Sequence, residues 1–192
     1  MYRYDEILKL LHKYKEGKSV SLEEKAKDGK AELEINSANT LFAISLSHKD
    51  SIKVFKHQKV ADWIVLEFLD DTHKRINLHL IELKKTITDS SWQKIKEQLK
   101  GAYEHSFLLK ALFNYEIDKI CCYSAFVYDK LTSNSIANTT NPILLKNSVG
   151  NKNMTSSIDW ENDEVNITNQ IINHKKIKLN LADEVGKGIY NI

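Results

Sequence analysis

The chain has 192 residues, 42% of them hydrophobic and 28% charged, with a formal net charge of +2 at pH 7. This composition is typical of a soluble globular protein long enough to bury a core without disulfides, and we expect residues 1–192 to form a single domain. No segment approaches membrane-spanning length and the N-terminus lacks the pattern of a signal peptide, so we expect a cytoplasmic protein with no membrane contact.

The first 57 residues predict a short helix followed by strands. Residues 4–15 place apolar side chains near helical spacing and carry Asp5 and Glu6 in the first turn. The polar span 19–30 is interpreted as a helical turn or a loop. Three segments with strand character follow, separated by polar turn residues, and predict an antiparallel meander: 31–35, 40–47 and 51–56.

The middle of the chain carries the most regular patterns. Two long apolar runs, 61–71 and 75–85, are joined by a segment short enough for a β-hairpin. Residues 89–113 show the spacing of an amphipathic helix, and 118–129 predict another buried strand. Together these segments predict an α/β protein with a central mixed β-sheet flanked by helices.

The composition changes after residue 130. Residues 131–164 are rich in Asn, Ser and Thr and predict a polar insertion or an irregular layer. The tail from residue 165 offers two short apolar pieces around a basic patch. Because arginine occurs only at Arg3 and Arg75, contacts of lysine with a phosphate backbone are easier to support than base reading by arginine.

Charged residues stand at the end of the predicted strand 75–85. Alternation puts Glu82 and Lys84 on the same face as apolar residues earlier in that strand. Asp62 occupies the matching face of the preceding strand, and the hairpin pairs the start of one strand with the end of the other. Two carboxylates and an ammonium group are therefore expected to converge at one edge of the core.

Two neighbouring carboxylates repel each other, so a divalent cation is a natural third member of the cluster. Hard oxygen ligands without a cysteine or histidine cluster favour Mg²⁺ or Mn²⁺ over zinc. Such a cation activates water and stabilises the charge of a phosphoryl transition state. Lys84 could orient or deprotonate that water, or neutralise the developing charge.

Asp62, then Glu82-Leu83-Lys84 on the next strand, then a helix with Gln98, resemble the PD-(D/E)XK nuclease superfamily and its RecB-like branch. The resemblance covers about 60–128 and implies a restriction-endonuclease-like core. It implies that Asp62, Glu82 and the backbone carbonyl of Leu83 bind Mg²⁺. It also implies that Lys84 assists the attacking water and that Gln98 supports the site.

The resemblance further implies a glutamate contributed by a first helix. Glu6 is the candidate, and Glu23 and Glu24 compete with it. The sequence departs from the superfamily pattern at Ala61, which stands where a proline often precedes the aspartate. The region before residue 58 also has more predicted strand than the minimal core needs.

Each of these residues also has an alternative without chemistry. Glu82 and Lys84 could be an exposed ion pair at a strand end, which contributes little to stability. Asp62 could be a turn residue before its strand, and Gln98 could belong to the polar face of its helix.

The expected function is metal-dependent endonucleolytic hydrolysis of DNA, in preference to RNA, as in restriction, repair or anti-phage defence. Cutting both strands of a duplex would favour a homodimer, because one site attacks one strand at a time. The first alternative is a non-catalytic module that uses the nuclease fold to bind nucleic acid or a larger complex. The second is an effector that cuts RNA.

Overall fold

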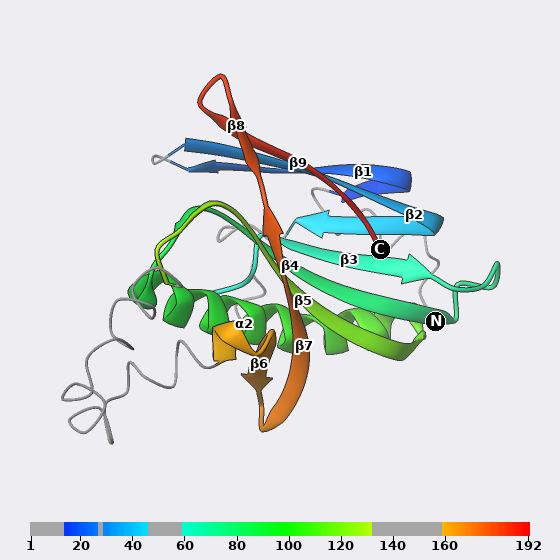
Figure 1. The fold of residues 1–192 in the computed structure, drawn as a ribbon. Coiled ribbons are helices and arrows are strands. Elements are labelled where there is room, and N and C mark those ends of the chain that lie inside the picture. The colour runs from blue at the N-terminus through cyan, green and yellow to red at the C-terminus, as the bar shows by residue number, and fades with distance from the viewer. Residues whose placement is uncertain (1–13, 27–28, 46–58, 132–158) are drawn as a thin grey trace.

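The computed structural model describes residues 14–26, 29–45, 59–131 and 159–192. Within these ranges nine strands form one mixed sheet in the order β6-β7-β5-β4-β3-β2-β9-β8, with β1 paired to β2 outside this path (Figure 1). The strands are β1 (Tyr14–Ala26), β2 (Gly29–Ser45), β3 (Trp63–Phe68), β4 (Arg75–Ile87), β5 (Glu116–Asp129), β6 (Glu164–Ile167), β7 (Gln170–Lys178), β8 (Asn180–Ala182) and β9 (Val185–Asn191). The long helix is α2 (Asp89–Phe113). The predicted mixed sheet is therefore present, in a structure that is mostly strand.

The centre of the sheet has the elements that the sequence predicts, in the predicted order. Strands β3 and β4 form an antiparallel hairpin, and β5 lies parallel to β4 after the crossover through α2. The helix begins with a capping box in which the Thr88 side chain accepts from the backbone N–H of Ser91. It ends at Asn114 in the left-handed conformation.

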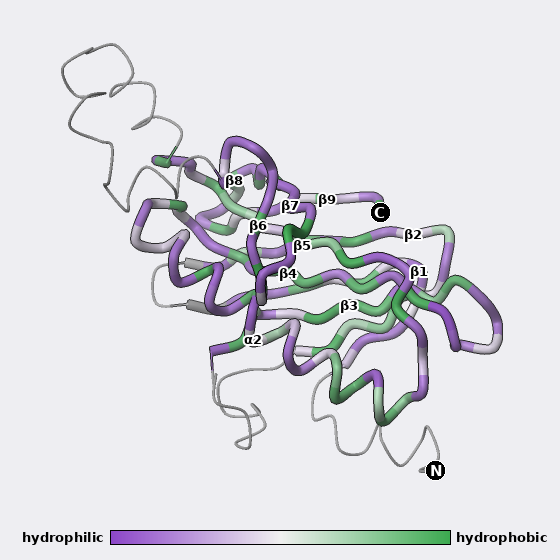
Figure 2. The backbone as a smooth tube through the Cα atoms, turned by 90° about the horizontal axis from the view of Figure 1, so that it is seen from below, coloured by the Kyte–Doolittle hydropathy of each residue, from purple (hydrophilic) through white to green (hydrophobic). Residues whose placement is uncertain are grey.

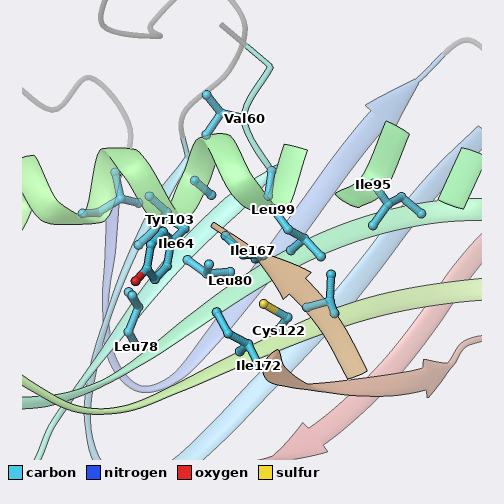
Figure 3. Packing of buried hydrophobic residues seen from close by; sticks show 14 of the residues in the cluster. Val60, Ile64, Leu78, Leu80, Ile95, Leu99, Tyr103, Cys122, Ile167 and Ile172 are labelled. Atoms are coloured by element: carbon cyan, nitrogen blue, oxygen red, sulfur yellow. The ribbon is translucent and has the colours of Figure 1, made fainter. Parts of the chain in front are cut away.

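Two apolar cores lie on opposite faces of this sheet. One is closed by α2, whose residues Ile95, Leu99 and Tyr103 pack on side chains of β3 and β4 such as Ile64 and Leu80 (Figure 3). The other core lies on the face away from α2, and most of its buried residues come from β2 and β5, with others from β1, β3 and β4. Figure 2 shows apolar residues along the central strands, with hydrophilic residues at their ends. Among the described residues, the long helix beside this sheet is α2, and it covers one of the two faces.

The N-terminal prediction is wrong in two places. Residues 19–30 form most of a β-hairpin, because β1 pairs with β2 from Ser19 to Ala26. The segments 31–35 and 40–47 were expected as two strands but belong to one strand, β2, up to Ser45. Of the predicted helix 4–15, the structure describes only residues 14 and 15, which lie in β1, and the predicted strand 51–56 lies outside the described residues.

A buried polar network explains why β2 continues through its polar centre. Ser37 and Asn39 donate hydrogen bonds to one carboxylate oxygen of Glu67, at 2.6 and 3.0 Å. Asn77 donates to the other oxygen at 2.7 Å, and His79 lies 3.4 Å from it. The side chains that predicted a turn are thus partners of a buried carboxylate, and the pairing of β1 with β2 shifts register at this point.

The C-terminal part is more regular than predicted. Residues 164–191 form two hairpins, β6–β7 and β8–β9, and β7 joins the parallel part of the sheet beside β5. Strand β9 lies parallel to the first half of β2, while β3 pairs with its second half. Most of the predicted polar insertion 131–164 lies outside the described residues. No helix in the described part of the chain is long and apolar enough to cross a membrane.

Candidate metal and catalytic site

Asp62 and Glu82 meet where strand β3 begins. The register pairs Trp63 with Ile81 and Ile64 with Leu80, so Asp62 comes opposite Glu82. The backbone N–H of Asp62 donates to Oε2 of Glu82 at 3.0 Å. The backbone N–H of the neighbouring Leu83 donates to Oδ2 of Asp62 at 2.9 Å. The two carboxylates are thus tied together across the hairpin, as the alternation of the two strands predicted.

The position of Asp62 follows from the end of strand pairing. Strand β3 starts at Trp63, so the chain has left the ladder where Leu83 would need its next backbone partner. The Asp62 side chain supplies that acceptor instead, because a buried backbone N–H is costly without one. The same geometry brings a carboxylate beside Glu82.

Both carboxyl groups are unfavourably placed for ionisation. Glu82 is fully buried, and its burial together with the nearby charge of Asp62 holds its pKa well above the usual range. Burial also raises the pKa of Asp62, although Lys84 and the Leu83 N–H act in the opposite direction. The raised pKa values mean that the ionised forms of these two neighbouring carboxyl groups are incompletely stabilised, so additional positive charge beside them would be favourable.

Lys84 and Glu24 complete the cluster. The ammonium nitrogen of Lys84 lies 2.5 Å from Oε1 of Glu82 and 3.4 Å from Oε1 of Glu24. Burial alone would lower the pKa of Lys84, but Glu82, Asp62 and Glu24 together raise it above its ordinary value. Lys84 is therefore a protonated ammonium at neutral pH. Apart from this ion pair, Oε1 of Glu82 accepts no hydrogen bond from the part of the chain that the structure describes.

Gln98 contributes its backbone rather than its side chain. Its carbonyl oxygen accepts the N–H of Ala61 at 2.9 Å, immediately before Asp62. Among the described residues, no hydrogen bond joins the Gln98 side chain to Asp62 or Glu82. The helix therefore contacts the site at the predicted residue, through a group that the sequence pattern does not reveal.

Strand β1 carries two of the three candidate glutamates, Glu23 and Glu24. Glu24 reaches Lys84, whereas the Glu23 side chain pairs with Lys15 at 3.7 Å and its carbonyl accepts from Trp63 Nε1 at 3.3 Å. Glu6 lies outside the described residues. The acidic residue near the lysine thus comes from a strand that was predicted as a helical turn or a loop.

The donor set fits a hard divalent cation in part. Asp62 and Glu82 offer carboxylate oxygens, and the surplus of negative charge around Lys84 favours an added cation. Within the described ranges, no three side chains of His, Cys, Asp or Glu converge closely enough to hold a metal ion. A cation here would therefore use two carboxylates and complete its shell with backbone, water or substrate oxygens, which is usual for Mg²⁺.

A scan against models of protein families and searches of curated proteins and of solved structures find no match to this chain.

Proposed function

We propose that this protein is a metal-dependent nuclease that hydrolyses phosphodiester bonds, with DNA as its substrate in preference to RNA. The observation that carries the proposal is the pairing of Asp62 with Glu82. Both carboxyl groups have raised pKa values, and their in-chain counter-ion is the ammonium group of Lys84. The likeness of these residues to the PD-(D/E)XK pattern supports the same function.

In this proposal Asp62 and Glu82 hold Mg²⁺ or Mn²⁺, and the backbone carbonyl of Leu83 is the third protein ligand. When bound, the cation neutralises phosphate charge and lowers the pKa of water. Lys84 donates hydrogen bonds from its ammonium group, so it orients the attacking water or stabilises the developing phosphate charge. Its raised pKa argues against proton abstraction by Lys84 in the metal-free state. Glu24 holds the Lys84 side chain from the other side.

The test is a cleavage assay on linear, circular and single-stranded DNA and on RNA, with Mg²⁺ or Mn²⁺ against EDTA. Wild type is compared with Lys84→Met, which keeps an unbranched side chain without its charge, and with Lys110→Met. Lys110 pairs with Glu116 on the surface and serves as the matched control. Cutting that needs metal, is lost in Lys84→Met and persists in Lys110→Met supports the proposal. Cutting of RNA alone would change the substrate class.

Cutting that survives Lys84→Met would refute the assigned site. A second outcome is that wild type cuts no substrate, and that wild type and the Asp62→Asn variant bind DNA with equal affinity. In that case the protein is a binding module rather than an enzyme. Sedimentation with and without duplex DNA would show whether two copies assemble, as cutting of both strands favours.

A further inference from the structure

The chain segment before Asp62 lies in direct contact with helix α2 at Gly101. A Cβ atom on Gly101 would stand 1.9 Å from the carbonyl oxygen of Lys59 and 3.0 Å from its carbonyl carbon. These are backbone atoms, so rotation of a side chain could not relieve the overlap. Glycine is unfavourable in a helix interior relative to alanine. At this buried position the close approach of the Lys59 backbone explains why the helix has a glycine.

Two further contacts fasten the same segment to the helix. Ala61 donates its N–H to the carbonyl oxygen of Gln98 at 2.9 Å. Val60 is 8% exposed and belongs to the core that α2 closes, and Figure 3 shows it beside the helix. Residues 59 to 61 are therefore held one after another by a single turn of α2.

Asp62 follows this segment without a spacer. Consecutive Cα atoms are about 3.8 Å apart, so a shift of Ala61 is passed on to Asp62. The helix also follows β4 directly through Thr88, and β4 carries Glu82. Helix α2 is thus connected to both halves of the carboxylate pair, by covalent linkage to one and by the contact at Gly101 to the other.

We propose that Gly101 is a positioning residue for the carboxylate pair. By allowing the backbone of Lys59 to touch α2, it sets the place where the chain enters β3 and hence the position of Asp62 against Glu82 and Leu83. The role in cation binding rests on the proposed function. The effect on the Asp62 position does not, and it can be measured without metal.

The experiment compares Gly101→Ala with Gly186→Ala as a matched control. A Cβ atom on Gly186 would stand 2.5 Å from Cγ2 of Val127, so this substitution also crowds a core, but on β9 and in the cluster of the opposite face. Amide hydrogen exchange of Ala61, Asp62 and Leu83 is measured by NMR in EDTA. Global stability and Mn²⁺ affinity are measured on the same samples.

We expect Gly101→Ala to speed the exchange of the Asp62 and Leu83 amides at least tenfold relative to Gly186→Ala at comparable global stability. We also expect it to weaken Mn²⁺ binding at least tenfold. Equal exchange at these amides in the two variants would overturn the positioning role. Absence of Mn²⁺ binding by wild type would refute the proposed function but not the positioning role of Gly101, because the exchange measurement in EDTA tests that role without metal.

A milder pair of variants decides the question if Gly101→Ala does not fold. Val60→Ala loosens the same segment without steric overlap, and Val165→Ala removes the same atoms from the same core on β6. Faster exchange of the Asp62 amide in Val60→Ala than in Val165→Ala supports the positioning of Asp62 by α2. The same exchange in both variants contradicts it.

Discussion

Replacing Asp62 with asparagine should stabilise the metal-free protein at neutral pH. Asparagine keeps an oxygen that can accept the N–H of Leu83, and it presents an amide toward Glu82 in place of a second negative charge. The substitution therefore removes charge while it preserves the hydrogen bond that Asp62 makes. Any ligand that needs the charge should lose affinity at the same time.

The sign of the effect follows from the raised pKa of Asp62. Burial is the largest cause, and neither Lys84 nor the Leu83 N–H offsets it, so the ionised carboxylate is less favourable in the folded than in the unfolded chain. Removing it also relieves the repulsion that raises the pKa of Glu82. Substitutions that relieve strain of this kind commonly add about 0.5–2 kcal/mol. For a domain of this size each kcal/mol raises Tm by roughly 2–4 °C.

The gain should depend on pH in one direction. A carboxyl group whose pKa is raised on folding contributes stability below its unfolded pKa, near 3.8 for aspartate. That contribution is lost as the pH rises through the folded-state pKa. Wild type and Asp62→Asn should therefore differ little at or below pH 3.8 and diverge as the pH rises.

Urea denaturation in EDTA from pH 3.5 to 8, followed by circular dichroism, measures this difference. Asp70→Asn is the control with the opposite sign. Hydrogen bonds from the Thr72 hydroxyl and the Lys74 backbone N–H lower the pKa of Asp70, so its ionised form stabilises the turn. If Asp62→Asn is less stable than wild type by the same amount at every pH, the carboxylate is a structural hydrogen-bond acceptor and the electrostatic reasoning is wrong.

Three further outcomes are expected. Glu67→Gln should destabilise the fold by roughly 1–3 kcal/mol at pH 7, because Glu67 is a buried acceptor; urea denaturation measures this, and equal stability would contradict it. His79 and other hydrogen-bond donors lower the pKa of Glu67 below the ordinary glutamate value of 4.5. The loss of stability in Glu67→Gln should therefore shrink as the pH falls below 4.5. Burial lowers the pKa of His174 to about 3, so its ring signals in NMR should not titrate between pH 5 and 8, and a midpoint in that range would refute the neutral buried imidazole. Glu24→Gln should lower kcat about tenfold if Glu24 orients Lys84. It should change stability by less than about 1 kcal/mol, and an unchanged kcat would exclude the orienting role.

The central unit could be predicted because its patterns are local. Residues 63–113 alternate with period two and then change to helical spacing, and the six residues between β3 and β4 suit a hairpin. The approach of Asp62 to Glu82 follows from this register alone. These predictions needed no contact between distant parts of the chain.

The N-terminal hairpin could not be predicted in this way. Among the side chains of strand β1 whose burial is described, the buried apolar ones are Val20 and Leu22, so its sequence resembles a polar loop. In β2 the turn-forming residues Ser37 and Asn39 are stabilised by Glu67, about thirty residues away along the chain. Long-range partners of this kind override local propensity. The place of Glu24 beside Lys84 depends on the same hairpin and was therefore missed.

Gly101 carried a signal that periodicity does not use. An isolated glycine in a helical pattern costs about 1 kcal/mol relative to alanine, which suggests a close backbone contact at that position. The sequence does not say which segment makes the contact. The hydrogen bond that the Gln98 carbonyl accepts could not be predicted from the sequence either, because every residue has a backbone carbonyl.

Lys84 stabilises the metal-free protein by balancing the charge of the two carboxyl groups. Replacing Lys84 should therefore lower the stability of the fold, whereas replacing Asp62 should raise it. The Lys84 ammonium group lies 2.5 Å from Oε1 of Glu82, an oxygen that accepts no hydrogen bond from the described residues. Lys84→Met would leave Glu82 fully buried beside Asp62 without a counter-ion. Leaving a buried charged group unpaired costs roughly 1–3 kcal/mol or more. We expect Lys84→Met to lower the urea midpoint in EDTA, and Asp62→Asn combined with it to recover part of the loss, because only one carboxylate then lacks a partner. If both single substitutions shift the midpoint in the same direction, the ammonium group is not the counter-ion of the pair, since the two residues carry opposite charges at one place.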